Sequence, residues 1–548
     1  MQNANTAVSA RTGQSRRGIC PFVSRHALFA FCILHFAFLG ACARTPPQTV
    51  PAGPAAAIAT PSDPPLAAPG APAPSTPVNP AAAAATGSDP APSISRLRWE
   101  ILAATAAPGV QRGTWGILVH SIDRNERLFE LNPRALLVPA SIVKLLAVST
   151  AVDAVGWDYR YTTTLSTAGT IADGVLHGDL IVTGSGDPSL GGRGGDAMSV
   201  LVDAVKTAGI RQIDGRIIGN DDALEDARPA LAWAWDDLGY PAGALFGALN
   251  YAENRTAVTA RSGWSVGAPG EVTLEPVPDG RPIINRTVTV ASGATQFVWP
   301  EQRPGETGLT IAGSVALGRT AARLNISAGN PTAWFATMLR HQLVAAGVAV
   351  GGSAVDIDDI QHDFVETPLY TYRSPALAQI TVPMLKDSIN LYAESAMRLN
   401  SAPVTPKTND TALEGFKARM TAWGISPDAY QVIDGSGLSR RDTAAPEVFL
   451  AVLQRMYDAS GRSPWMQALP IAGVDGSLEN RMKGTAAERN VRAKTGTMSN
   501  IRSLAGYVTS GDGERLAFVI ILNDFEGPGA EALQAIDKIA VLLATFKR

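Results

Sequence analysis

The sequence holds one Ser-x-x-Lys tetrapeptide, Ser141-Ile142-Val143-Lys144, within a run of residues that are nearly all apolar. Residues three apart on a helix share a face, with about 5 to 6 Å between their Cβ atoms, so the Lys144 amine can reach the Ser141 hydroxyl. A serine hydroxyl becomes a nucleophile when a base takes its proton, and a lysine serves as that base only if its pKa falls toward neutral. Burial lowers a lysine pKa because it disfavours the ammonium form. The pair therefore predicts a serine nucleophile beside a lysine base.

Two further groups of polar residues lie far along the chain. Ser388-Ile389-Asn390 falls in the stretch 384–394, whose pattern predicts a helix, and Lys494-Thr495-Gly496-Thr497 falls on a predicted strand. Taken singly, the first is also typical of a polar helix face and the second of an exposed edge strand. The three groups in this order, on helix, helix and strand, form a combination that is far more specific than any one of them.

A second serine motif, Gly263-Trp264-Ser265-Val266-Gly267, matches the Gly-x-Ser-x-Gly pattern of α/β-hydrolase nucleophiles. That pattern requires a strand before the serine and a helix after it. Here Ala268-Pro269-Gly270 follows, and no Gly-rich oxyanion loop is evident. We therefore do not expect Ser265 to be a nucleophile.

Composition excludes several classes of partner and cofactor. The net charge of −3 and the absence of any Lys/Arg-rich run argue against nucleic acid as a partner. All cysteines lie in the first 42 residues, and the histidines beyond them lack the close spacing of a metal-binding motif. We expect no metal and no cofactor. A Ser-His-Asp triad needs only one histidine, so the count alone does not exclude it.

The Ser141 helix needs elements that place it against the other two motifs. Pro139 precedes the helical run 142–155 and Gly156 follows it, as a helix start and a helix end would require. Alternating runs at 115–122 and 127–131 predict a β-hairpin, and the runs 491–497, 502–508 and 515–522 predict three more strands, followed by a helix at 530–546. Hairpins from both ends of the folded region can form one antiparallel sheet, with the Ser141 helix packed against it.

The middle of the chain has a different pattern of residues. Between about 159 and 366, short Val/Ile/Thr runs recur between Gly, Asp and Pro turns, with amphipathic helices at 197–208 and 331–346. This predicts an insert that is rich in strands.

The N-terminal 95 residues predict export. Arg16, Arg17 and Arg25 precede an apolar run at 27–41, which is typical of a secretory signal peptide and too short for a good membrane span. The run ends Leu39-Gly40-Ala41-Cys42, which resembles the lipobox of bacterial lipoproteins, where the cysteine is lipidated; ordinary cleavage near Ala41 is the alternative. An Ala/Pro-rich stretch follows to residue 95 and predicts a disordered linker. We expect a periplasmic protein tethered to a membrane through Cys42, the outer membrane if the cell has one.

The three motifs resemble those of penicillin-binding proteins and class A β-lactamases. With the segments 184–189, 434–440 and 475–478 and the long stretch between the first two motifs, the chain from about Ser95 onward is similar to the class C low-molecular-mass penicillin-binding proteins. That resemblance implies an α/β (α+β) fold. It consists of a penicillin-recognising DD-peptidase/β-lactamase-like domain, with an antiparallel sheet and flanking helices, plus a mostly-β insert that forms one or two extra domains.

The resulting domain prediction has four parts: a signal peptide with a possible lipobox at 1–42, a linker at 43–95, the catalytic domain at 96–160 and 366–548, and the insert at 161–365. The implied activity is that of a serine D-alanyl-D-alanine carboxypeptidase, endopeptidase or both. Such an enzyme acts on peptidoglycan stem peptides through an acyl-enzyme, and β-lactam antibiotics inhibit it covalently.

The same resemblance implies a role for each motif residue. Ser141 is the acylated nucleophile, Lys144 its proton acceptor, and Ser388 the relay to the leaving D-alanine. Substrate binding is assigned to Asn390, Lys494, Thr495, Gly496 and Thr497, with the backbone N–H groups of Ser141 and Thr497 as the oxyanion hole.

The chain departs from many relatives at Ile389, where they have aspartate, and we expect that side chain to face away from the cleft. Arg440 and Arg441 are either contacts for a second substrate carboxylate or solvated charges beside a turn. A β-lactamase would use the same motifs, although no Glu-x-x-Leu-Asn is found. An inactive cell-wall-binding scaffold is the remaining alternative.

Overall fold

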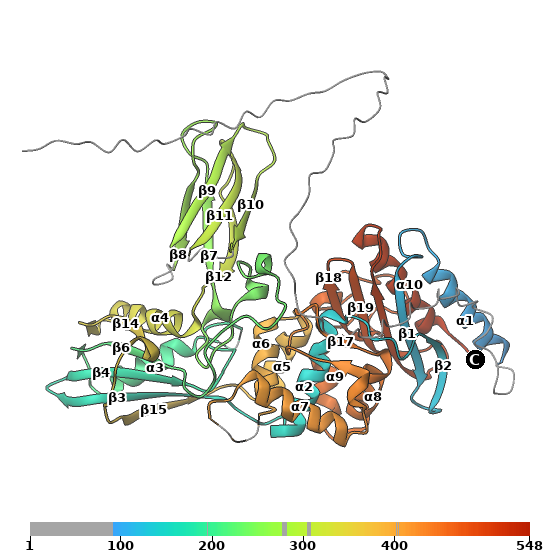
Figure 1. Cartoon of the computed structure of the whole chain (residues 1–548), viewed down its shortest axis with the longest axis horizontal. Coiled ribbons are helices and arrows are strands. Elements are labelled where there is room, and N and C mark those ends of the chain that lie inside the picture. The colour runs from blue at the N-terminus through green and yellow to red at the C-terminus, as the bar shows by residue number, and fades with distance from the viewer. Residues whose placement is uncertain (1–90, 194, 277–281, 304–307, 402, 404) are drawn as a thin grey trace, which may run out of the picture. The chain divides into compact units, whose positions relative to one another are not determined.

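The computed structural model describes residues 91–548 except 194, 277–281, 304–307, 402 and 404 (Figure 1). The predicted signal peptide, Cys42 and nearly all of the predicted linker lie outside the described residues. No helix among the residues that are described is both long and apolar enough to cross a membrane.

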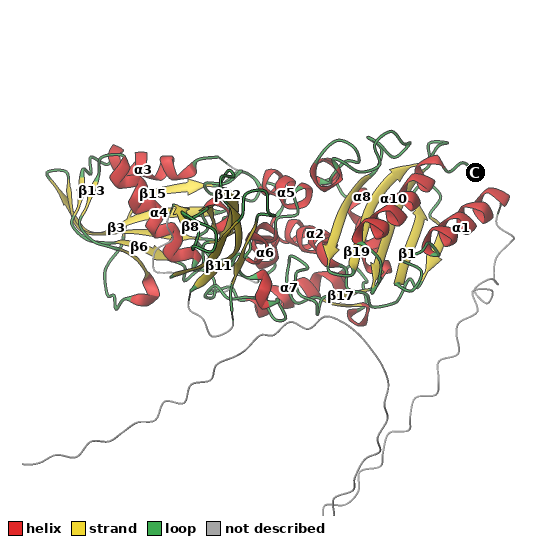
Figure 2. Ribbon diagram, turned by 90° about the horizontal axis from the view of Figure 1, so that it is seen from above, coloured by secondary structure: helices red, strands yellow, loops and turns green. Residues whose placement is uncertain are grey.

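A five-stranded antiparallel sheet joins the two ends of the described chain (Figures 1 and 2). Its strand order is β18-β19-β20-β1-β2, so the N-terminal hairpin pairs with the C-terminal strands through β1 and β20. The strands are β1 (Thr114–Ser121), β2 (Glu126–Leu131), β18 (Arg492–Met498), β19 (Ile501–Thr509) and β20 (Arg515–Asn523). The runs that predict these five strands agree with them to within a residue or two.

Strand β20 shows how helices cover both faces of this sheet. Side chains alternate between faces along a strand, and Phe518, Ile520 and Leu522 pack into one apolar cluster while Ala517, Val519 and Ile521 pack into another. The first cluster lies under α1 (Pro92–Thr105) and α10 (Gly529–Thr545), and the second lies under α2 and α8. The helices on that second side are α2 (Val143–Val155), α5 (Leu377–Lys386), α6 (Asn390–Arg398), α7 (Asn409–Ala422), α8 (Pro446–Asp458) and α9 (Arg462–Ala468).

Helix α2 is the central element of that second cluster. Every residue from Val143 to Ala151 is buried, Lys144 included, because the sequence is apolar on all sides of the helix. Gly156 ends the helix with a φ of 83°, a conformation that glycine adopts without strain. Ser141 lies just before α2 and not in the α-helix itself. It is in a single 3₁₀ turn (η2, Ala140–Ile142) that leads into α2.

The insert contains a second sheet of seven strands with the helices α3 (Ala197–Thr207) and α4 (Pro331–Ala345). Its strands are β3 (Thr162–Ala172), β4 (Val175–Gly184), β5 (Gln212–Ile213), β6 (Ile217–Asn220), β13 (Ala349–Val350), β14 (Ala354–Asp356) and β15 (Thr367–Arg373). Strand β15 pairs with β3, so the chain leaves this sheet after Arg373. The predicted boundary at residue 366 is therefore wrong. Strand β15 (Thr367–Arg373) belongs to the sheet of the insert, so the insert ends after Arg373.

Two three-stranded sheets form the rest of the insert, and they share a small apolar core around Val258, Ile311 and Ile326. Their strands are β7 (Arg255–Arg261), β8 (Glu271–Glu275), β9 (Ile283–Val290), β10 (Phe297–Glu301), β11 (Leu309–Ala316) and β12 (Ala322–Ser327). A short ladder of β16 (Tyr430–Gln431) and β17 (Thr443–Ala444) stands apart from these sheets.

Candidate active site

Ser141 and Lys144 lie together at the start of α2. The Lys144 Nζ is 2.9 Å from the Ser141 Oγ, and it also donates to the Oδ1 of Asn390 at 2.7 Å and to the carbonyl oxygen of Ser436 at 2.6 Å. Lys144 is fully buried. Burial lowers its pKa to about 7, against the opposing effect of nearby carboxylates, so near neutral pH about half of these amines are free to accept a proton.

Ser388 and Asn390 occupy a break between two helices. The sequence predicts one helix through 384–394, and this is wrong, because α5 ends at Lys386 and α6 begins at Asn390. Ser388 has a φ of 60°, in the left-handed region that a continuous right-handed helix cannot contain. Ile389 packs against the core between these helices, as expected of a side chain that faces away from the polar cleft.

Lys494 on β18 is the third motif residue at this place. Its Nζ donates to the Ser388 Oγ at 2.9 Å and to the Thr495 carbonyl oxygen at 2.8 Å. Burial, followed by the positive charge of Lys144, lowers the pKa of Lys494 well below its usual range. Two lysines and two serines thus meet in one buried polar site.

Gly496 lets β18 approach the turn that carries Ser141. A Cβ at this position would lie 2.1 Å from the Ser503 Oγ and 2.6 Å from the Pro139 carbonyl oxygen. Next to it, Thr495 donates its hydroxyl to the Ser477 Oγ at 2.7 Å, and Thr497 is exposed. β18 is the last strand of its sheet. Its outer edge is paired at Ala493, whose N–H donates to the Pro470 carbonyl oxygen, and the edge beyond that residue can pair with an extended peptide.

The turn 434–439 is part of the site, although the sequence singles it out only through the resemblance. The Asp434 Oδ1 accepts from the N–H groups of Ser436 and Gly437, and its Oδ2 accepts from that of Ser439. Glu394 accepts from Gly435 and Ser436. These bonds hold the Ser436 carbonyl against Lys144. The glycines in the turn predict the bend, but nothing in the sequence pairs it with Lys144.

Gly437 brings this turn against the serine. Its φ is 76°, and a Cβ there would lie 2.2 Å from the Ala140 carbonyl oxygen, so glycine is required on both grounds. Arg440 and Arg441, at the end of the turn, are exposed.

The alternative nucleophile Ser265 lies elsewhere. It is in the connection between β7 and β8, two antiparallel strands, and the neighbouring Trp264 is 89% exposed. No helix follows it, so the arrangement of a hydrolase nucleophile is absent at this position.

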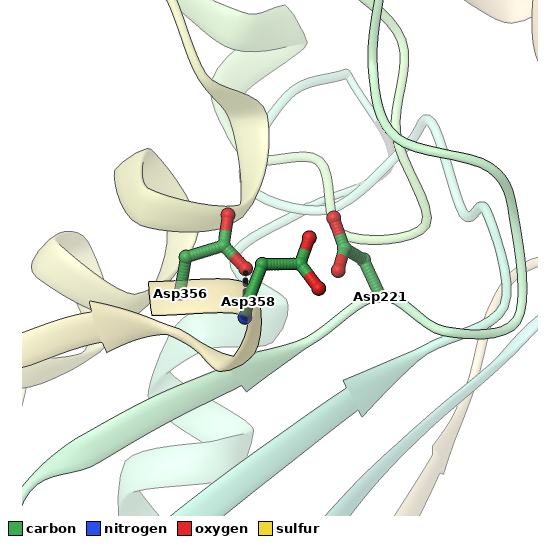
Figure 3. A group of neighbouring side chains, drawn as sticks. All are labelled: Asp221, Asp356 and Asp358. Atoms are coloured by element: carbon green, nitrogen blue, oxygen red, sulfur yellow. Dashed lines mark hydrogen bonds between the residues drawn. The ribbon is translucent and has the colours of Figure 1, made fainter. Parts of the chain in front are cut away.

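Among the described residues, Asp221, Asp356 and Asp358 form a group of carboxylates that could hold a cation, with oxygens within 4.8 Å of one another. Figure 3 shows Asp356 and Asp358 on one segment and Asp221 on another. Burial and the other two carboxylates raise the pKa of Asp221 to about 6. All three lie in the insert, and none belongs to the three motifs. The expectation of no metal rested on cysteine and histidine alone, and more than 130 positions separate Asp221 from the other two aspartates, so no short motif marks this group in the sequence.

Comparison with known proteins gives consistent results. The sequence pattern of the D-Ala-D-Ala carboxypeptidase 3 (S13) family matches residues 97–546. A D-alanyl-D-alanine carboxypeptidase of Actinomadura sp. (strain R39) is 30% identical over 465 residues, which cover 83% of this chain and 85% of that protein. The D-alanyl-D-alanine carboxypeptidase DacB of Haemophilus influenzae is 26% identical over 417 residues, 75% of this chain and 85% of that protein.

The fold is similar to that of a solved structure. The crystal structure of penicillin binding protein 4 from Haemophilus influenzae matches with a TM-score of 0.72 and 24% identity, over 83% of this chain and 99% of that one. The same protein complexed with a novel β-lactam matches with a TM-score of 0.67 and 23% identity, over 83% of this chain and all of that one. The predicted fold class, a DD-peptidase domain with flanking helices and a large insert, is confirmed.

Proposed function

The chain belongs to the D-Ala-D-Ala carboxypeptidase 3 (S13) family of serine peptidases, and on that premise we propose that Ser141 is its nucleophile and Lys144 its base. The substrate is the D-alanyl-D-alanine end of a peptidoglycan stem peptide. The observation that carries this proposal is the 2.9 Å contact between the Ser141 Oγ and a buried lysine amine whose pKa is about 7.

Acylation replaces the amide bond to the terminal D-alanine by an ester bond to Ser141. The Ser141 oxygen attacks the carbonyl carbon of the penultimate D-alanine while its proton passes to the Lys144 amine. The C–N bond to the terminal D-alanine breaks, and the Ser388 hydroxyl gives its proton to the leaving amine and takes up the proton that Lys144 holds. Water later attacks the ester, which releases the shortened peptide and restores Ser141.

The terminal carboxylate of the substrate is held by β18. Lys494 is the buried amine at this position, and a carboxylate beside it would favour its charged form. The Thr495 and Thr497 hydroxyls lie on the same strand, whose outer edge pairs with the substrate backbone. The N–H groups of Ser141 and Thr497 bind the oxyanion, a contribution of about 10²- to 10³-fold per donor in comparable acyl transfers.

A fluorescent penicillin and a D-Ala-D-Ala peptide test this proposal together. The wild-type protein should take up the label covalently, lose it slowly, and release D-alanine from the peptide. Ser141→Ala should take up no label and release no D-alanine. Ser265→Ala is a matched change in the rejected motif, and it should be labelled and should release D-alanine like the wild type. Rapid loss of the label would instead indicate a β-lactamase, and no label on a folded wild-type protein would indicate an inactive scaffold.

The balance between carboxypeptidase and endopeptidase activity is a separate question. Both reactions use the same acyl-enzyme and differ only in the leaving amine, which is a free D-alanine in one case and a cross-linked stem in the other. Digestion of purified cross-linked muropeptides, compared with uncross-linked pentapeptides, measures the two rates directly.

We further propose that the protein is anchored as a lipoprotein through Cys42, on the side of the membrane where peptidoglycan lies. Support comes from the sequence alone, in the apolar run 27–41 that ends Leu39-Gly40-Ala41-Cys42. Cells fed a radiolabelled fatty acid should label the wild-type protein and not Cys42→Ser. Equal labelling of both would contradict the anchor.

A further inference from the structure

Three hydrogen bonds join one segment of the insert to the catalytic site. The Trp233 Nε1 donates to the Asp434 Oδ2 at 2.7 Å, and the Ser439 hydroxyl donates to the Leu231 carbonyl oxygen at 2.8 Å. The Asn390 Nδ2 donates to the Ala242 carbonyl oxygen at 2.8 Å. Their insert partners all lie within residues 231–243, a segment between β6 and β7 that contains two short 3₁₀ turns.

One catalytic partner of these bonds, Asn390, contacts the Lys144 amine directly. The other two, Asp434 and Ser439, belong to the turn whose Ser436 carbonyl contacts that amine. Apart from Ser141, Lys144 donates to Asn390 and to Ser436. Asn390 has an oxygen at one end of its amide and an NH₂ at the other. Because the NH₂ end is bound by Ala242, the oxygen end faces Lys144.

The insert segment also holds the second acceptor, the Ser436 carbonyl, although indirectly. The Ser436 carbonyl belongs to the turn 434–439, and Asp434 organises that turn by accepting three of its N–H groups. The Ser436 hydroxyl donates to it as well, and Trp233 adds a donor from outside the turn. Hydrogen bonds to a buried carboxylate are among the stronger ones in proteins and fix orientation.

We propose that the insert segment 231–243 positions the catalytic base, and that Trp233 is a positioning residue that acts on Lys144 through Asp434 and the Ser436 carbonyl. This inference rests on the proposed role of Lys144. It gives the insert a part in the chemistry: the segment fixes both acceptors that hold the amine beside Ser141.

The charges around Lys144 set the direction of the pH effect. Asp434, Glu394 and Asp442 are buried near it and favour its ammonium form. Lys494 is the other amine nearby, and the charge of Lys144 helps to lower the pKa of Lys494. Both acceptors, the Ser436 carbonyl and the Asn390 Oδ1, also favour the ammonium form. Loosening either acceptor therefore lowers the pKa of Lys144. The acylation rate falls at acidic pH because Lys144 becomes protonated, and we call this part of the pH dependence the acidic limb. With a lower pKa of Lys144, the acidic limb should move to lower pH.

The test uses the full mature protein and a fluorescent penicillin, with the acylation rate constant separated from the binding constant. Trp233→Phe keeps an aromatic ring and removes the indole N–H. It should lower the acylation rate constant about tenfold, the effect of losing one hydrogen bond to a charged group. The binding constant should be unchanged, and the acidic limb should move to lower pH. Trp264→Phe is the same substitution in the exposed β7–β8 connection and should match the wild type.

Ser439→Ala provides a second variant if Trp233→Phe folds poorly. It removes the bond to Leu231 and the bond that the Ser439 hydroxyl accepts from the Arg441 N–H. It should shift the acidic limb in the same direction by less. An unshifted limb in both folded variants, or a rate lowered only in proportion to the fraction of folded protein, would overturn the positioning role. A wild-type protein that takes up no label would overturn the proposed function itself, whatever the Trp233 variants show.

Discussion

The Lys494 Nζ lies 2.9 Å from the Ser388 Oγ, although 106 positions separate the two residues along the chain. The contact joins β18 to the break between α5 and α6, and it places a buried amine directly beside the proposed proton relay. Two of the three motifs therefore meet through their side chains, and the Lys144–Asn390 contact joins the first motif to the second.

Replacing Lys494 by alanine should lower acylation by a D-Ala-D-Ala peptide on the order of 100-fold, because the substrate carboxylate loses its cation and Ser388 loses a donor. The rate of D-alanine release measures this. Lys483→Ala is the matched control, since Lys483 is exposed. Equal rates for the Lys494 variant and the wild type would show that this lysine does not hold the substrate.

The rate of acylation should rise with pH and reach half of its plateau near pH 7. The pKa of Lys144 is about 7, so the ammonium form dominates below that pH and cannot take the proton of Ser141. Rates measured from pH 5.5 to 8.5 with a fluorescent penicillin test this expectation. A rate that stays constant over the whole range would exclude Lys144 as the base.

Gly496→Ala should destabilise the catalytic domain by about 1 to 3 kcal/mol, the usual result of overpacking a buried site. The added Cβ would meet the Ser503 Oγ at 2.1 Å and the Pro139 carbonyl at 2.6 Å. Thermal unfolding measures the loss, and Ser503→Ala in the same chain should recover part of it. A fully stable Gly496→Ala protein would mean that β18 does not lie against the turn of Ser141.

Asp221→Asn should stabilise the protein at pH 7.5 by about 1 to 2 kcal/mol and much less at pH 4.5. The pKa of Asp221 is raised to about 6 in the fold, so the folded state loses stability from this group as pH rises from about 4 to 6. The amide avoids that loss and can still accept from Thr332, which donates to this side chain at 2.6 Å. Asp222→Asn, an exposed neighbour, should change little. Destabilisation of Asp221→Asn at pH 7.5 would contradict the assigned direction.

Much of the fold could be predicted because its signals are local. The apolar run of α2, the alternating hairpin 114–131 and the three C-terminal strands all lie where their patterns place them. The contact between Ser141 and Lys144 was also predictable, since it depends only on the spacing of three within one turn.

The parts that were not predicted depend on long-range contacts or on backbone conformation. The residues around Ser388 do not predict its φ of 60°, because the tertiary structure around the break imposes that conformation. The roles of Glu394 and Ser436 follow from a turn that folds back onto α2, and Asp221 meets Asp356 only after separate strands have paired. Such groups become visible only when the chain is folded.

Mapping the covalent adduct of a β-lactam tests the central claim most directly. The wild-type protein is incubated with benzylpenicillin and digested, and the modified peptide is identified by mass spectrometry. The adduct should lie on Ser141, remain in Ser265→Ala, and be absent from Ser141→Ala. An adduct on any other residue, or none on a folded protein, would contradict the account.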